Sequence, residues 1–156
     1  MDSFRRIVQS LRSSHRAAGH LNLTGAQLFV IHALHDAGRP LSVSELAART
    51  RTDPSTVSVV VGRLVRKGLV QSVRSTKDNR RAELSLTKKG EMLQRKAPAT
   101  VAQEKLLQAL EELNERDAAV LERLLIGIVD VMGEADTPAS MLFDTQPGLE
   151  LPRKRR

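Results

Sequence analysis

The 156-residue sequence contains no cysteine, which excludes disulfides, thiolate zinc sites and redox sensing through a thiol. It also has no tryptophan, no tyrosine and only three phenylalanines, Phe4, Phe29 and Phe143. Proteins that bind single-stranded nucleic acid or RNA usually stack the bases on aromatic side chains. Because that platform is missing, a nucleic-acid partner of this chain is expected to be double-stranded.

Long apolar segments and phosphate-binding loops are missing too. No apolar run approaches the roughly 18 residues of a membrane-spanning helix, and the first 16 residues lack the apolar core of a signal peptide. We therefore expect a cytoplasmic protein with no membrane partner. The nine glycines form neither GxGxxG nor GxxxxGK, and no nucleophile is paired with a base, so neither an enzyme nor a cofactor is expected.

Charge is abundant, and it is distributed unevenly along the chain. The net charge is +7, and residues 49–96 hold 13 Lys and Arg against 4 Asp and Glu. Residues 97–136 hold 3 Lys and Arg against 9 Asp and Glu. Charge that serves only solubility is usually mixed in sign, whereas a concentrated positive region suits a polyanion such as duplex DNA.

The first half of the chain predicts three short helices. Apolar residues at helical spacing predict an amphipathic helix over 3–18, interrupted from Gly19 onward. Two later helices each begin with a capping box, in which a Ser or Thr is followed three residues later by Gln or Glu. These boxes pair Thr24 with Gln27 and Ser42 with Glu45.

Residues 53–69 read DPSTVSVVVGRLVRKGL, and their three consecutive valines suggest a strand. The spacing favours a helix over 54–67, since one face carries Val57, Val60, Val61 and Leu64. β-Branched residues cost at most about 0.7 kcal/mol each in a helix. Burying a valine returns about 1.5–3 kcal/mol. Packing therefore outweighs propensity, and Asp53 followed by Pro54 is a suitable helix start.

The second half predicts a hairpin and further helices. Two strand-like runs, 69–74 and 82–86, flank a basic polar turn and predict a β-hairpin. A helical region follows over 88–112, in which Pro98 is expected to cause a kink or a break. A last helix over 116–133 is apolar on more than one face.

These elements predict a mainly α fold with a small β-hairpin wing, a winged helix-turn-helix with further helices before and after it in the chain. The expected parts are an N-terminal helix at 1–20, the DNA-binding lobe at 21–96, C-terminal helices at 97–135 and a flexible tail at 136–156. The tail ends in four basic residues, which either add nonspecific DNA affinity or only solubilise the chain.

The sequence resembles the MarR (multiple antibiotic resistance regulator) type of winged-helix transcription factor over roughly residues 5–133. Each matching segment is weak alone, but their order and spacing are specific. The segments are Leu23-Thr24 with Gln27, Ser44-Glu45-Leu46-Ala47, Asp53 to Ser58, Leu64-Val65 with Gly68-Leu69-Val70, and Asp78 with Arg80 followed by Leu86-Thr87 and Gly90.

The resemblance implies a homodimer, with the N-terminal helix at 1–20 and the C-terminal helices at 97–135 as the dimerisation helices. It also implies that the dimer binds double-stranded DNA through two recognition helices at 54–67. It also implies a wing in which Arg80 enters the minor groove while Asp78 orients a basic neighbour. The residues expected to contact DNA are Ser55, Thr56, Ser58, Val59, Arg63, Arg66, Lys77, Asp78, Asn79, Arg80 and Arg81. Thr56 either contacts a base or only caps the helix.

Two positions depart from the family pattern. Many relatives carry a basic residue where this chain has Val59 and an acidic one where it has Gly62. Valine can touch a thymine methyl but cannot bond to guanine, so base reading is expected to rest on the hydroxyl side chains or on DNA shape. The expected function is a sequence-specific regulator, by default a repressor, that binds a pseudo-palindromic operator.

The family usually holds an effector between the dimer helices and the DNA-binding lobe. In this chain Arg12, His15, Arg16 and His20 either bind a small anionic aromatic ligand there or are ordinary surface residues. Two alternatives remain open, a zinc-responsive regulator that uses the histidines and a winged-helix module that binds only protein. No carboxylate or cysteine completes an obvious ligand set with His32 and His35, so we expect surface or pocket histidines and no metal.

Overall fold

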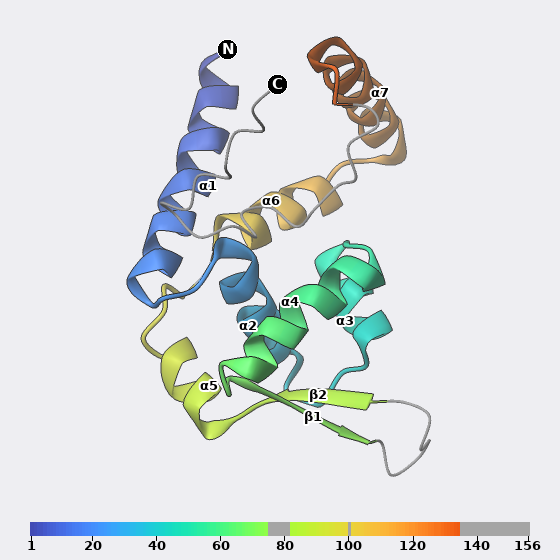
Figure 1. The fold of residues 1–156 in the computed structure, drawn as a ribbon. Helices are drawn as coiled ribbons and strands as arrows, with labels where there is room; N and C mark the ends of the chain where they lie inside the picture. The colour runs from blue at the N-terminus through green and yellow to red at the C-terminus, as the bar shows by residue number, and fades with distance from the viewer. Residues whose placement is uncertain (75–81, 100, 135–156) are drawn as a thin grey trace, which may run out of the picture.

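The computed structural model describes residues 1–74, 82–99 and 101–134 (Figure 1). The fold is mainly α with one two-stranded hairpin, as the sequence predicts. In chain order the elements are α1 (Asp2–His20), α2 (Gly25–Ala37), α3 (Val43–Thr50), α4 (Pro54–Arg66), β1 (Val70–Arg74), β2 (Ala82–Leu86), α5 (Lys88–Gln94), α6 (Ala102–Glu111) and α7 (Glu115–Met132).

Side-chain caps determine where several helices begin. Both predicted capping boxes form, with Thr24 accepting from the Gln27 amide at the start of α2 and Ser42 accepting from the Glu45 amide at the start of α3. At the other end of α1 the sequence placed the interruption at Gly19. The helix instead continues to His20, and the chain turns at Asn22, whose φ is 55°.

Helix α2 forms the centre of the lobe that contains α2 to α5 and the hairpin. It contacts α1, α3, α4, α5 and β2, and its residues from Gly25 to Leu34 are all buried. A helix with neighbours on so many sides has no solvent face over most of its length. Its burial therefore organises the lobe around it.

The valine-rich segment is a helix, as its spacing predicts. Val57, Val60, Val61 and Leu64 of α4 are buried in the shared core, while Val59 is 51% exposed. After α4 the chain turns at Gly68, with φ of 67°, and enters the antiparallel hairpin, which pairs Val70 with Leu86 and Arg74 with Ala82. Leu41 forms an isolated bridge to Leu84, which joins the segment before α3 to the hairpin.

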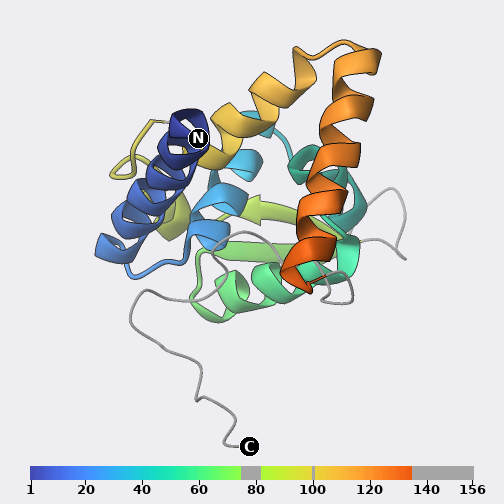
Figure 2. The same ribbon diagram turned by 90° about the horizontal axis from the view of Figure 1, so that it is seen from above.

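The predicted helical region over 88–112 is broken rather than kinked. Helix α5 ends at Gln94 and α6 begins at Ala102, with Pro98 between them. Helix α6 packs against α1 and leads to α7. Both α1 and α7 lie away from the hairpin (Figure 1), and seen from above they stand on opposite sides of the molecule (Figure 2). Within the described part of the chain, no helix is both long and apolar enough to cross a membrane.

Candidate nucleic-acid interface

Helices α3 and α4 form a helix-turn-helix with a tight connection. The turn places Arg51 in the left-handed region, with φ of 48°, and its amide still bonds to the last carbonyls of α3. Asp53 then caps α4 through the amide of Ser55 at 2.6 Å. Hydrogen bonds from the Ser55 hydroxyl and amide lower the pKa of Asp53. The carboxylate therefore stays ionised as a cap at neutral pH.

The exposed face of α4 carries small side chains. Ser55, Ser58, Val59 and Gly62 are all exposed on the face opposite the buried valines, whereas Thr56 is partly buried. The hydroxyl of Ser55 donates to Oδ1 of Asp53 at 2.5 Å, and that of Ser58 donates to the carbonyl of Pro54 at 2.8 Å. A duplex could approach this face closely, because no long side chain stands in the first two turns.

Two arginines lie at the C-terminal end of the same helix. Arg66 is exposed and its Nε donates to the carbonyl of Gly62 at 3.4 Å, while Arg63 is partly buried. Cations in the last turn are favourable for the helix itself. They also stand where a recognition helix meets the phosphates that flank a groove.

Lys67, which no sequence pattern indicates as a functional residue, anchors α4 to the α1–α2 turn. Its Nζ donates to the carbonyl of Asn22 at 2.6 Å and to Oε1 of Gln27 at 3.0 Å. Burial lowers the pKa of the Lys67 ammonium. The partners are 45 and 40 residues away in sequence, so no local pattern could have identified them.

The predicted wing contacts Lys77, Asp78, Asn79, Arg80 and Arg81 lie outside the described residues. The hairpin that leads to them forms as predicted. The exposed Arg74 is the last residue of β1, directly before that segment.

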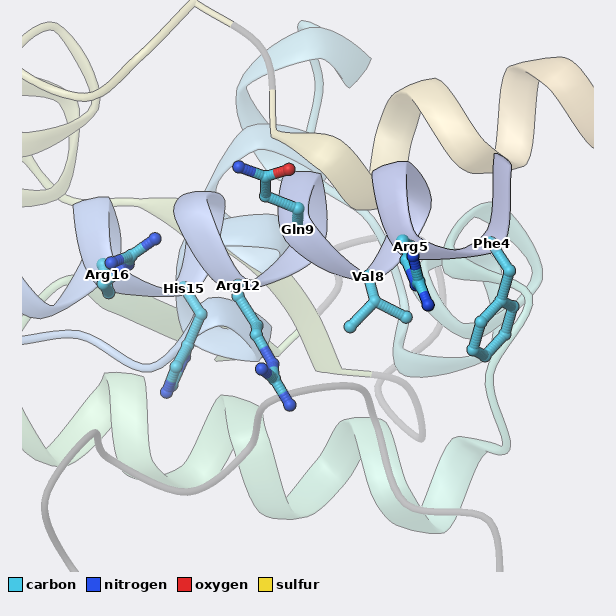
Figure 3. A pocket seen from close by; sticks show the side chains of 7 residues that line it. All are labelled: Phe4, Arg5, Val8, Gln9, Arg12, His15 and Arg16. Atoms are coloured by element: carbon cyan, nitrogen blue, oxygen red, sulfur yellow. The ribbon is translucent and has the colours of Figure 1, made fainter. Parts of the chain in front are cut away.

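The basic residues of α1 line a cavity of about 590 Å³. Arg12, His15 and Arg16 take part with Phe4, Arg5, Val8 and Gln9, but His20 does not. Figure 3 shows Val8, Arg12 and His15 projecting to the same side of α1. Nδ1 of His15 accepts from the Gly25 amide at 3.4 Å, and burial lowers the pKa of this histidine. The cavity therefore combines an apolar end with cationic and neutral imidazole groups.

The sequence predicts surface or pocket histidines, and the structure shows that His32 is not at the surface. Its side chain is 1% exposed, and its Nδ1 lies 3.1 Å from Oε1 of Glu104 on α6. The reason is that α2 packs on several sides, so the face away from Leu28 and Ile31 is buried as well. His35 lies 3.0 Å from Asp36. No group of three potential metal ligands occurs among the described residues.

An ion pair joins the turn between α3 and α4 to α6. Nη2 of Arg51 lies 3.2 Å from Oε1 of Glu111. Both side chains are 57% exposed, so the pair contributes little stability, about 0–1 kcal/mol. It nevertheless connects the turn before the recognition helix with the segment that leads to α7.

Comparison with known proteins agrees with this geometry. Residues 21–81 match the model of the MarR family. The HTH-type transcriptional repressor MdtR of Bacillus subtilis strain 168 is 38% identical over 89 residues, which cover 57% of this chain and 55% of MdtR. The chain thus matches about half the length of this relative.

Solved structures show the same fold over most of the chain. The YusO protein of B. subtilis is 28% identical, with a TM-score of 0.53, and the match covers 83% of this chain and 88% of YusO. A mutant of MarR from E. coli, solved in complex with operator DNA, is 23% identical, with a TM-score of 0.57 and coverage of 82% and 91%. Residues 21–81 thus carry the sequence pattern of the MarR family, and most of the chain has the fold of the solved MarR structures.

Proposed function

We propose that this protein is a homodimeric regulator that binds double-stranded DNA sequence-specifically and represses transcription by default. The observation that carries the proposal is the exposed face of α4. Small polar and apolar groups occupy its first turns, arginines stand at its end, and the core holds its other face. MdtR is named a transcriptional repressor and the MarR structure contains operator DNA, which supports the same role here.

Two such helices in a dimer would enter successive major grooves about 34–36 Å apart, so the operator should be a pseudo-palindrome. Ser55, Thr56, Ser58 and Val59 would face base edges. Arg63 and Arg66 would contact phosphates. The wing residues would contact the backbone or the minor groove, and these backbone contacts would supply most of the affinity.

The second copy is expected to cover α7 and α1. In α7 no residue is buried, and the exposed apolar side chains include Leu124 at 55% and Ile128 at 53%. A hollow of about 590 Å³ also lies against α7, lined by Leu121, Leu125 and Val129 among others. Apolar surface on this scale marks a protein interface. Phe4 and Ile7 of α1 are exposed apolar side chains as well, on a separate helix that the second copy is also expected to cover.

The α1 cavity is the proposed effector site, and a small anionic aromatic ligand is its expected occupant. An anion there would favour protonated His15, which could no longer accept from the Gly25 amide. Gly25 begins α2, and Gln27 on the same helix holds Lys67 at the end of α4. Such a ligand could therefore shift α4 and stabilise a spacing that no longer fits the operator.

Sequencing DNA fragments selected by the purified protein tests the central claim. A repeated inverted half-site with helical-turn spacing is expected. In a follow-up titration, Arg80→Ala should weaken operator binding and reduce the slope of log affinity against log salt by about 1, as the loss of one phosphate contact predicts. If no duplex is selected over competitor DNA, a winged-helix module that binds only protein becomes the better interpretation.

A further inference from the structure

Gly62 stands in the middle of the exposed face of α4, where the fold gives no reason for a glycine. A Cβ built there meets no atom within 4 Å, and its φ is not positive. Glycine weakens a helix interior relative to alanine. The missing side chain is therefore not explained by packing inside this protein.

Gly90 provides the contrast. A Cβ at that position would run into the backbone oxygen of Leu69, so the fold itself requires glycine at the start of α5. At Gly62 the space opens outward, on the same helical face as Ser55, Ser58 and Val59. Something outside the chain can approach the α4 backbone closely at this point.

The two serines on this face have no free donor in this structure. The Ser55 hydroxyl donates to the Asp53 carboxylate, and the Ser58 hydroxyl donates to the Pro54 carbonyl. Both partners are acceptors only, so the single proton of each hydroxyl is used in its intrahelical hydrogen bond. Lone pairs remain on Ser55 Oγ and Ser58 Oγ. They can accept hydrogen bonds from a ligand while the intrahelical bonds stay in place.

The neighbouring Val59 adds an apolar group, 51% exposed, to the same patch. In the major groove adenine offers an N6 amino donor and thymine a methyl group, whereas guanine offers only acceptors. Cytosine also offers an amino donor but has no methyl, so only an A·T pair supplies both the donor that the serines accept from and the methyl that Val59 contacts. Arg63 and Arg66 could donate, but they lie at the other end of the helix.

We propose that the exposed face of α4 reads A·T base pairs at close range. Ser55 and Ser58 accept from adenine amino groups, Val59 packs on a thymine methyl, and Gly62 leaves the space that lets the groove edge approach. This inference rests on the proposed DNA-binding function and specifies the bases that the function would select.

Base analogues test the two kinds of contact separately. Within the selected half-site, replacing thymine by uracil at one position should weaken binding roughly fourfold, as the loss of one buried methyl predicts. Val59→Ala should abolish that difference. Replacing adenine by purine, which lacks the amino group, should weaken binding roughly fivefold, and Ser58→Ala or Ser55→Ala should abolish that difference.

Gly62→Ala tests the close approach. The variant should melt roughly 2–4 °C higher, because alanine favours the helix. It should nevertheless bind the operator roughly tenfold more weakly, because the added methyl overpacks the interface.

Different outcomes would overturn the A·T reading and the proposed DNA binding. Selected half-sites with guanine opposite Ser58, uracil that binds as well as thymine at every position, or unchanged affinity in Gly62→Ala would overturn the A·T reading while DNA binding stands. If no duplex is selected at all, the proposed function and this inference fail together.

Discussion

Helices α4 and α7 are both rich in aliphatic residues, but they use them differently. In α4 four aliphatic side chains are buried in the core, and the opposite face presents hydroxyls and a glycine within a basic region of the chain. In α7 no residue is buried, and the surrounding segment is acidic. An amphipathic helix buries its single apolar face within one chain. A surface helix that is apolar on several faces leaves apolar area that another molecule can cover.

The largest effect should come from placing charge on α7. Leu124→Glu combined with Ile128→Glu should separate the dimer and lower operator affinity roughly a thousandfold, toward nonspecific binding, because each monomer then holds only one half-site. Sedimentation and gel-shift titration measure both consequences. Met92→Glu, at a site 62% exposed on α5, is the control and should leave the dimer intact. A double variant that remains dimeric would show that α7 is not the interface.

Truncating one leucine in each helix distinguishes packing in the core of α4 from packing of α7 at the expected dimer interface. Leu64→Ala on α4, at 0% exposure, should lower the free energy of unfolding by about 2–5 kcal/mol at every protein concentration. Leu125→Ala on α7, at 48% exposure, should lose stability only in a concentration-dependent way, because its contacts would lie in the dimer. Chemical denaturation at two concentrations distinguishes them. If the loss of unfolding free energy depended equally on protein concentration in both variants, the difference between the two helices would be contradicted.

Gly90→Ala tests whether packing inside the fold requires a glycine at this position. A methyl directed at the Leu69 backbone forces the start of α5 away from the hairpin, so the free energy of unfolding should fall by about 1–3 kcal/mol. Thermal melting provides the measurement, and Gly62→Ala is the natural reference because it is expected to change the melting temperature in the opposite direction. A neutral Gly90→Ala would mean that the hairpin root adapts easily.

The smallest effect concerns the capping box of Ser42 and Glu45 at the start of α3. Hydrogen bonds from the Ser42 backbone and side chain, with Arg39 contributing less, lower the pKa of Glu45 to about 2. A lowered pKa adds stability that is complete above the unfolded value near 4.5 and is lost as the pH falls toward 2. Glu45→Gln should therefore lose less stability than the unsubstituted protein between these pH values, as melting curves would show. Identical acid profiles would exclude this contribution.

Local chemistry explains which elements could be predicted from the sequence. The capping boxes at Thr24 and Ser42 and the start at Asp53 depend on groups within three residues of each other, so spacing alone identifies them. The valine helix follows from a single apolar face. The break near Pro98 follows from the missing amide of proline.

Contacts between distant segments could not be predicted in this way. The burial of His32 depends on α6 lying over α2, and its partner Glu104 is 72 residues further along the chain. The clamp from Lys67 to Gln27 and the pair of Arg51 with Glu111 are of the same kind. The cavity along α1 contains three of the four predicted effector residues, and their role as a ligand site stays a prediction.

Periodicity, caps and charge act within a few residues of each other, so the helices, the hairpin and the basic middle of the chain follow from the order of the amino acids. The burial of His32, the anchoring of α4 by Lys67 and the outward-facing space at Gly62 are visible only in the folded molecule. Those properties depend on which surfaces meet, and surfaces meet through the packing of segments far apart in the chain.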